Sequence, residues 1–188
     1  AIREGVDPLD EPAMVRLARS LRVAMRPSPA TGPRVMLQGQ DVTRRIRTER
    51  VTDAAAIVAQ HPKVRAELVR LQRRLTQRHA CVVEGRDTGT VVFPNARYKF
   101  FLTANVQVRA RRRQQELRHI QGHAPHVSLI AKQLRRRDGL DLRRRTGPLV
   151  KPAGAVVLDT SRLSVRQVVQ RLLRSVEEAS CGCAPAGS

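Results

Sequence analysis

Residues 81–105 read CVVEGRDTGTVVFPNARYKFFLTAN and contain two short runs rich in β-branched or aromatic residues, at 81–84 and 98–102. A third run of this kind lies at 155–158, and segments of helical pattern separate the runs. Strands that alternate with helices favour an α/β fold with a parallel sheet, in which functional residues gather at the carboxyl ends of the strands. The residues at those ends are Gly85-Arg86-Asp87, Thr103-Ala104-Asn105 and Asp159-Thr160-Ser161.

Helices are expected around these strands. Residues 11–20 carry apolar side chains at helical spacing behind Asp10, a good N-terminal cap, and residues 62–78 begin with a proline, which suits a first helical turn. Between them, residues 21–25 and 35–38 flank a stretch containing Pro and Gly, as in a β-hairpin with an irregular loop. Further helices are predicted over 52–60, 106–121, 128–137 and 163–178.

The first residues have the pattern of a helix end. Ala1-Ile2-Arg3-Glu4 is followed by Gly5, the residue type preferred just after a helix, and soon by Pro8. A single turn does not nucleate alone, so the pattern predicts that this sequence begins partway through an element. Residues 181–188 are small and include Gly and Pro, and they are expected to form a flexible tail.

The chain is strongly basic. Its 188 residues include 36 Lys and Arg against 16 Asp and Glu, and the net charge of +20 favours an anionic partner: a nucleotide, a nucleic acid or an acidic protein. All but four of the basic residues are arginines, so a coding bias towards Arg, Ala and Val explains the bulk charge equally well. The composition is that of a folded protein, and no apolar run approaches the roughly 20 residues of a membrane helix.

Three scarce residue types argue against other functions. All aromatic residues lie within 93–101, which is typical of core packing along one strand and not of the spread platforms that hold single-stranded RNA. The three cysteines form neither a CxxC metal pair with partner ligands nor an even disulfide framework, which favours a reducing cytoplasmic setting. His119, His123 and His126 lack thiolate or carboxylate companions, so no metal site is predicted.

Arginines gather at 109–113, at 135–145 and at Arg86-Asp87. The first group lies at the expected start of a helix, where cations are unfavourable unless an anion or carboxylates offset them. The second holds aspartates inside an arginine run, a pattern that can bind a polyphosphate together with a ribose. A planar guanidinium suits bidentate phosphate recognition. Taken singly, each helical group is also consistent with a solvated face, and Arg86-Asp87 with a structural pair in a turn.

Short motifs occur in order along nearly the whole chain, and the block EGRDTGTVVFP at 84–94 is long and specific. The others lie at 38–48, 62–65, 101–104, 109–113, 136–144, 148–149 and 157–160. The combined pattern resembles the bacterial cytidylate kinases, nucleoside monophosphate kinases that phosphorylate CMP and dCMP. The resemblance implies a cytoplasmic, monomeric enzyme with no membrane partner that transfers the γ-phosphoryl group of ATP, bound with Mg²⁺, to CMP or dCMP.

The resemblance also implies the fold: a P-loop nucleoside-monophosphate-kinase-like parallel sheet flanked by helices, with a small inserted lobe that binds CMP. Residues 1–20 and 79–180 would form the core domain, with a lid at about 106–147, and residues 21–78 the lobe. The P-loop strand and second strand of the family are absent from this sequence, and none of the four lysines follows a glycine as in a P-loop. We therefore expect a truncated cytidylate kinase that is inactive alone.

Carried over residue by residue, the resemblance implies an acceptor site. Its substrate-binding residues are Arg65, Arg86, Arg137, Asp141 and Arg144. Arg65 would contact the cytosine edge, and Arg86 and Arg144 would bind the CMP phosphate. Arg137 and Asp141 would contact the sugar and its surroundings. Asp87 would help to orient the acceptor.

The donor would be bound by the lid. Arg109, Arg112 and Arg113 would close on the phosphates of ATP, and together with Arg86 and Asp87 they form the catalytic set that the resemblance implies. Phosphoryl transfer requires mainly in-line positioning and cations around the transferred group, and arginines suit that task.

A rival hypothesis is a kinase-derived protein without a P-loop that binds RNA or a ribonucleoprotein through its basic surface. The high charge favours this hypothesis, whereas the retained acceptor residues oppose it. Ala56 stands where the family commonly has a serine that helps to read cytosine, which leaves base selectivity open. Binding of CMP and of RNA across a salt series separates the two functions.

Overall fold

The computed structural model describes residues 1–28, 32–77, 80–143 and 147–181. The chain forms two compact units. The first comprises Ala1–Val92 with Arg145–Gly147, and the second comprises Phe93–Arg144 with Pro148–Ser188. The predicted division into a core domain and an inserted lobe stays a prediction. Residues 182–188, most of the predicted tail, lie outside the described residues.

The first unit begins with a single 3₁₀ turn, Ile2–Glu4, which ends at Gly5 in the left-handed conformation with φ 64°. The predicted helix end at this glycine is confirmed. Helix α1 (Glu11–Ser20) follows with the predicted bounds, and the Asp10 carboxylate accepts a hydrogen bond from the Ala13 amide at 2.9 Å. This bond satisfies one of the amides that a helix leaves unpaired at its N-terminus.

The predicted hairpin is confirmed. Strands β1 (Val23–Arg26) and β2 (Arg34–Leu37) pair antiparallel, and β2 also pairs with the short strand β3 (Gln40–Asp41). A 3₁₀ turn, Arg45–Arg47, leads into α2 (Glu49–Val58). The sheet therefore has one strand more than the sequence predicts.

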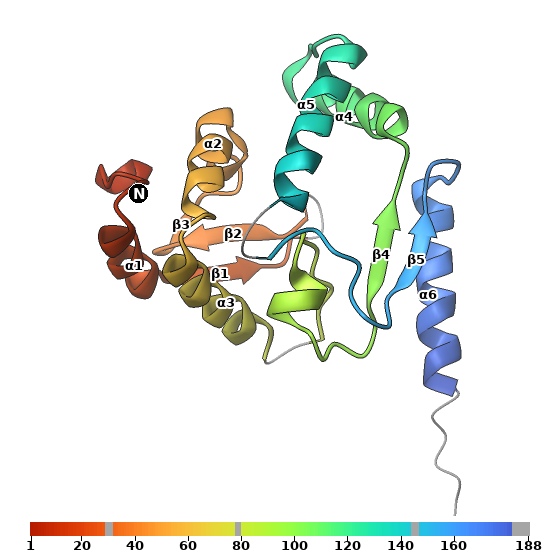
Figure 1. The fold of residues 1–188 in the computed structure, drawn as a ribbon, viewed down its shortest axis with the longest axis horizontal. Coiled ribbons are helices and arrows are strands. Elements are labelled where there is room, and N and C mark those ends of the chain that lie inside the picture. Colours follow the sequence, from red (N-terminus) through yellow and green to blue (C-terminus); the bar gives the residue numbers. More distant parts are fainter. Residues whose placement is uncertain (29–31, 78–79, 144–146, 182–188) are drawn as a thin grey trace, which may run out of the picture. The chain divides into compact units, whose positions relative to one another are not determined.

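Helix α3 (Pro62–Thr76) packs against α1 (Figure 1). Pro62 occupies its first turn, as predicted, because proline has no amide hydrogen that needs a partner there. The buried core between the two helices consists of Met14, Ala18 and Val64, with Leu68 and Val58 packed around it. This core holds α3 in place, and Arg65 and Arg73 on the same helix bond residues 87, 91 and 92.

The strand predicted over 81–84 is not formed. No strand among the described residues pairs with this segment, and the Val82 side chain is fully exposed. A run of β-branched residues becomes a strand only when a neighbour takes up its backbone hydrogen bonds. The chain instead continues into a π-helical turn, Thr88–Val92.

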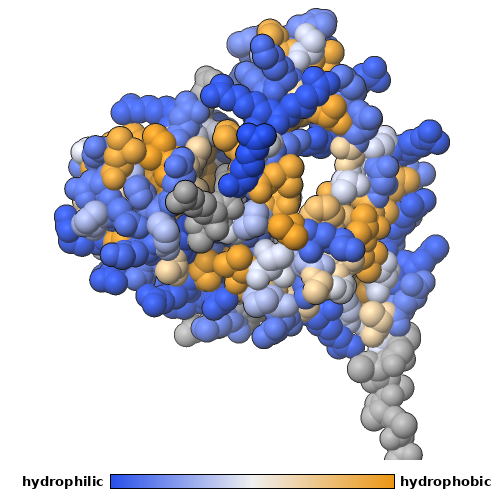
Figure 2. All heavy atoms as spheres, in the orientation of Figure 1, coloured by the Kyte–Doolittle hydropathy of each residue, from blue (hydrophilic) through white to orange (hydrophobic). Residues whose placement is uncertain are grey.

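The second unit contains the predicted parallel pair. Strands β4 (Phe100–Thr103) and β5 (Val156–Asp159) run parallel, with Phe100 opposite Val156 and Thr103 opposite Asp159. Leu102 and Val157 on these strands are each about half exposed, and Figure 2 shows hydrophobic residues over the two strands. The α/β class with a parallel sheet flanked by helices is therefore confirmed.

Helices flank this sheet. Helix α4 (Val106–Gln121) has its predicted bounds and ends at Gly122, whose φ of 77° is the left-handed conformation typical of a helix end. Helix α5 (Val127–Leu142) packs on α4 through a buried core of Ala110, Ile130 and Ala131. Helix α6 (Val165–Cys181) runs back towards the start of β4, where the Tyr98 hydroxyl lies 2.6 Å from the Ser180 hydroxyl.

Candidate functional site

An ion pair between Arg65 and Asp87 joins two predicted site residues of the first unit. Arg65 lies in the first turn of α3, and Asp87 comes directly before the π-helical turn. Their side chains are only 15% and 17% exposed, so the pair is largely removed from solvent screening. Two residues that the sequence analysis assigned to the acceptor nucleotide therefore lie in direct contact.

Asp87 is also fixed through its backbone. Its carbonyl oxygen accepts hydrogen bonds from the amides of Thr90 at 3.3 Å, Val91 at 2.9 Å and Val92 at 3.2 Å. The carboxylate is thereby attached to a closed turn rather than to an extended loop. This arrangement holds the Asp87 side chain at a defined position beside α3.

A second arginine of α3 binds the far end of the same turn. Arg73 donates from Nε to the Val92 carbonyl at 2.8 Å and from Nη2 to the Val91 carbonyl at 2.9 Å. Sequence analysis did not identify Arg73. Its spacing of eight residues from Arg65, about two helical turns, places both on one side of α3, but in so basic a chain this spacing alone does not mark the contact.

The backbone of Gly147 lies against the ion pair. Its φ of 61° is left-handed, and a Cβ atom at this position would lie 2.5 Å from Asp87 Oδ2 and 3.1 Å from Asp87 Cβ. A side chain at residue 147 would also collide with the Arg65 guanidinium. The site therefore requires glycine here, both for conformation and for space.

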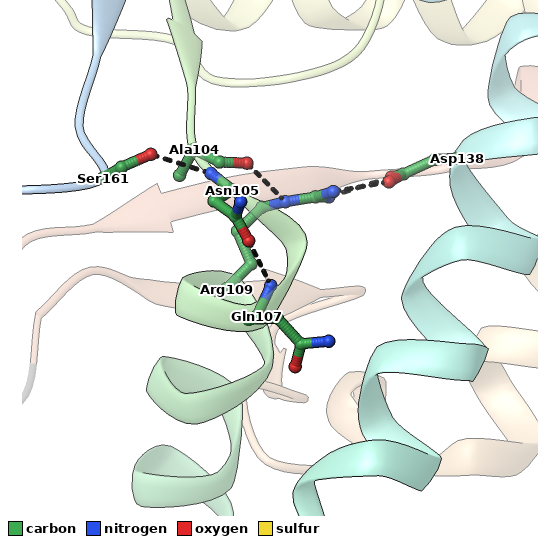
Figure 3. A network of polar contacts seen from close by, with 6 residues as sticks. All are labelled: Ala104, Asn105, Gln107, Arg109, Asp138 and Ser161. Atoms are coloured by element: carbon green, nitrogen blue, oxygen red, sulfur yellow. Dashed lines mark hydrogen bonds and ion pairs between the residues drawn. The ribbon is translucent and has the colours of Figure 1, made fainter.

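In the second unit, the predicted donor-binding Arg109 is held in place by its neighbours (Figure 3). Its guanidinium bonds both oxygens of Asp138 on α5, at 3.0 and 2.7 Å, and its Nε donates to the Ala104 carbonyl at 3.1 Å. Asn105 caps α4 by accepting from the Gln107 amide at 2.8 Å. Asp138 supplies the carboxylate that offsets cations at this helix start.

The other two predicted donor-binding arginines also have protein partners. Arg112 donates to the Thr160 hydroxyl at 3.0 Å, to the Thr160 carbonyl at 2.6 Å and to the Leu163 carbonyl at 3.1 Å. Arg113 pairs with Glu116 one turn further along α4, at 2.7 Å. Arg112 thus ties α4 to the segment that follows β5.

A cavity of about 570 Å³ opens at the carboxyl ends of β4 and β5. It is lined by Thr103, Ala104, Asn105, Val108, Asp159, Ser161 and Arg162. Hydrogen bonds from the Ser161 hydroxyl and amide lower the pKa of Asp159, so this carboxylate is ionised at neutral pH. Residues of both motifs predicted at these strand ends therefore line the cavity. Arg162 is a further cation in its lining, and this residue was not predicted from the sequence.

The remaining predicted residues are distributed over both units. Arg86 is partly buried in the first unit. Arg137 and Asp141 both lie on α5, where Arg137 is exposed and Asp141 is buried, with 1% of its surface exposed. Arg144 lies outside the described residues. The convergence of Arg86, Asp141 and Arg144 on one nucleotide stays a prediction.

Neither a metal cluster nor a membrane helix is found in the part of the chain that the structure describes. Within that part, His, Cys, Asp and Glu side chains do not form groups of three that could hold a metal ion. The helices there lack the length and apolar character that a membrane span requires.

Comparisons with known proteins identify the family. The cytidylate kinase family model matches residues 1–178. A cytidylate kinase of Geobacillus kaustophilus is 44% identical over 178 residues, which cover 95% of this chain and 79% of the relative. Cytidylate kinases of Pelotomaculum thermopropionicum and Caldanaerobacter subterraneus subsp. tengcongensis are 42% and 37% identical, over 94% and 96% of this chain and 77% and 78% of their own lengths. The chain belongs to the cytidylate kinase family.

Proposed function

We propose that this chain binds CMP or dCMP as the acceptor of the γ-phosphoryl group of ATP, so that the reaction yields CDP or dCDP. The observation that carries the proposal is the ion pair between Arg65 and Asp87. The family resemblance assigns both residues to the acceptor nucleotide, and they meet although they lie 22 positions apart in the sequence.

In the proposed site, Asp87 orients the Arg65 guanidinium towards the cytosine edge. A guanidinium has five N–H donors in a fixed plane, so a carboxylate that engages one of them leaves others for the base. The family resemblance assigns Arg86 and Arg144 to the CMP phosphate. It assigns Arg137 and Asp141 to the sugar and its surroundings.

The donor phosphates in this proposal meet Arg109, Arg112 and Arg113. The hydrogen bonds of Arg109 engage its Nε and one N–H of each Nη, so it keeps further N–H donors that can reach an anion. Arg112 bonds through its Nη atoms, and no described residue accepts from its Nε–H. These cations stabilise charge that spreads over the transferred group, and Mg²⁺ that arrives with ATP supplies further neutralisation.

Binding is the step to measure first, because the printed sequence contains no Gly-Lys-Ser/Thr segment of the kind that holds ATP phosphates in P-loop enzymes. Titration calorimetry of the 188-residue chain with CMP, UMP and AMP, across a salt series, tests the proposal. We expect CMP to bind at least about tenfold more tightly than UMP and AMP, because cytosine offers two adjacent acceptors, N3 and O2, to the Arg65 donors, whereas uracil carries an N–H at position 3 and adenine has a different edge.

The same salt series with single-stranded RNA distinguishes the kinase acceptor site from a basic surface. Equal affinity for the three nucleotides, together with steeply salt-dependent RNA binding, would contradict the proposal. A preference for CMP that persists at high salt supports it, since contacts to the base do not depend on counterion release.

A further inference from the structure

We propose that Arg73 is a positioning residue for the acceptor nucleotide. By binding the carbonyls at the end of the turn Thr88–Val92, it fixes Arg86 and Asp87 in the orientation that CMP requires. The inference rests on the proposed function, because it assigns Arg73 to the same site. Arg73 itself is not expected to touch the nucleotide.

The bonds of Arg73 have the geometry of a two-point attachment. Nε and Nη2 lie on one edge of the guanidinium plane, and they donate to the adjacent carbonyls of Val92 and Val91 at 2.8 and 2.9 Å. Carbonyls at the end of a helical turn lack partners within the turn, so they are good acceptors for a cationic side chain. Two parallel bonds fix the direction of the turn as well as its position.

Helix α3 therefore binds both ends of the segment 87–92. Arg65 holds the Asp87 carboxylate at the start of the turn, and Arg73 holds the carbonyls at its end. The two arginines are separated by about 12 Å along the helix axis, given a rise of about 1.5 Å per residue. The amides of Val91 and Val92 donate back to the Asp87 carbonyl, which links the two attachments through a short backbone path.

The attachment is separate from the hydrophobic core of the unit. That core is formed by Met14, Ala18 and Val64, whereas Arg73 is exposed and its hydrogen bonds run to the turn. Removal of the guanidinium should therefore release the turn without unfolding α1 and α3. Arg74, the next residue on α3, is exposed as well and has no hydrogen bond or ion pair with any described residue, so it provides a matched control.

The test compares CMP with cytidine, because their affinity ratio isolates the phosphate contact assigned to Arg86. Calorimetric titrations of the full chain would use wild type, Arg73→Met, Arg73→Lys and Arg74→Met. We expect Arg73→Met to lower the CMP-to-cytidine affinity ratio about tenfold, the size of one lost charged hydrogen bond. Arg73→Lys should recover part of the ratio, and Arg74→Met should leave it unchanged.

A second comparison shows whether Arg73 acts through Arg86. In an Arg86→Met background, the addition of Arg73→Met should lower the ratio no further. Hydrogen exchange provides a local readout: the amides of Thr90, Val91 and Val92 should exchange faster in Arg73→Met, while those of α1 stay protected.

The outcomes separate this inference from the proposed function. An unchanged ratio in Arg73→Met overturns the positioning role, and so does an equal loss of CMP and cytidine affinity accompanied by a lower Tm, because that result indicates a purely structural role. A wild-type chain that does not prefer CMP over UMP and AMP overturns the proposed function and, with it, this inference.

Discussion

Arg109 and Asp138 join helices α4 and α5 through a two-point ion pair, with Nη1 to Oδ1 at 3.0 Å and Nη2 to Oδ2 at 2.7 Å. This bidentate geometry is stronger and more directional than a single contact. Helix α5 extends to Leu142, beyond the predicted end at Arg137, and the bonded Asp138 lies in this extension.

We expect the ion pair between Arg109 and Asp138 to contribute measurably to the free energy of unfolding. The side chains are 32% and 24% exposed, so solvent screens part of the interaction, and Asp138→Asn should lower the free energy of unfolding by about 1 kcal/mol. Urea denaturation measures the change. The matched control is Glu116→Gln, which removes the partner of Arg113 in a pair whose side chains are 47% and 53% exposed and should change stability very little. Equal effects of the two substitutions would refute this account of α5.

Gly147 and Gly139 should respond in opposite ways to substitution by alanine. Gly147→Ala places a methyl group against Asp87 in a left-handed backbone, so we expect a loss of about 1–2 kcal/mol in unfolding free energy and weaker CMP binding. Gly139 lies inside α5 with open space around its Cα, and Gly139→Ala should stabilise the chain by about 0.5–1 kcal/mol. The same change in stability and CMP affinity at both positions would show that Gly147 does not support the ion pair.

The lowered pKa of Asp159, which lines the cavity of the second unit, predicts how this carboxylate responds to acid. Hydrogen bonds from Ser161 lower the pKa of Asp159 in the folded chain, so this carboxylate contributes stability above its unfolded pKa and loses it as pH falls through the folded pKa. Ser161→Ala should raise the pKa of Asp159 towards its ordinary value. A carboxyl-carbon NMR titration measures the shift, and an unchanged midpoint would exclude the Ser161 hydroxyl as its main cause.

Local signals in the sequence were sufficient for several elements. The Asp10 cap predicted the start of α1, and the Pro62 turn predicted the start of α3. The apolar runs of β4 and β5 were placed within two residues of their observed bounds, and their parallel pairing followed from the helices between them. The helix starts and the strand runs depend on neighbours in the sequence, whereas the pairing rests on the general rule that helices between strands favour a parallel sheet.

Contacts that depend on particular distant side chains could not be predicted. The run at 81–84 has the composition of a strand, but pairing and not composition decides whether a strand forms. The contacts of Arg73 and Gly147 arise only when α3, the turn and residue 147 meet, and in a chain with so many arginines an arginine alone does not mark such a contact. Arg65 and Asp87 were found through family resemblance, and their mutual ion pair became evident only in the fold.

The most direct measurement is a double-mutant cycle on CMP affinity with Arg65→Met, Asp87→Asn and the double variant, each titrated calorimetrically with CMP and with UMP. If the ion pair forms the cytosine-reading part of the acceptor site, each single variant should lose about tenfold or more in CMP affinity, and the double variant should lose clearly less than the product of the two effects. CMP binding with wild-type affinity and selectivity in all three variants would contradict the account.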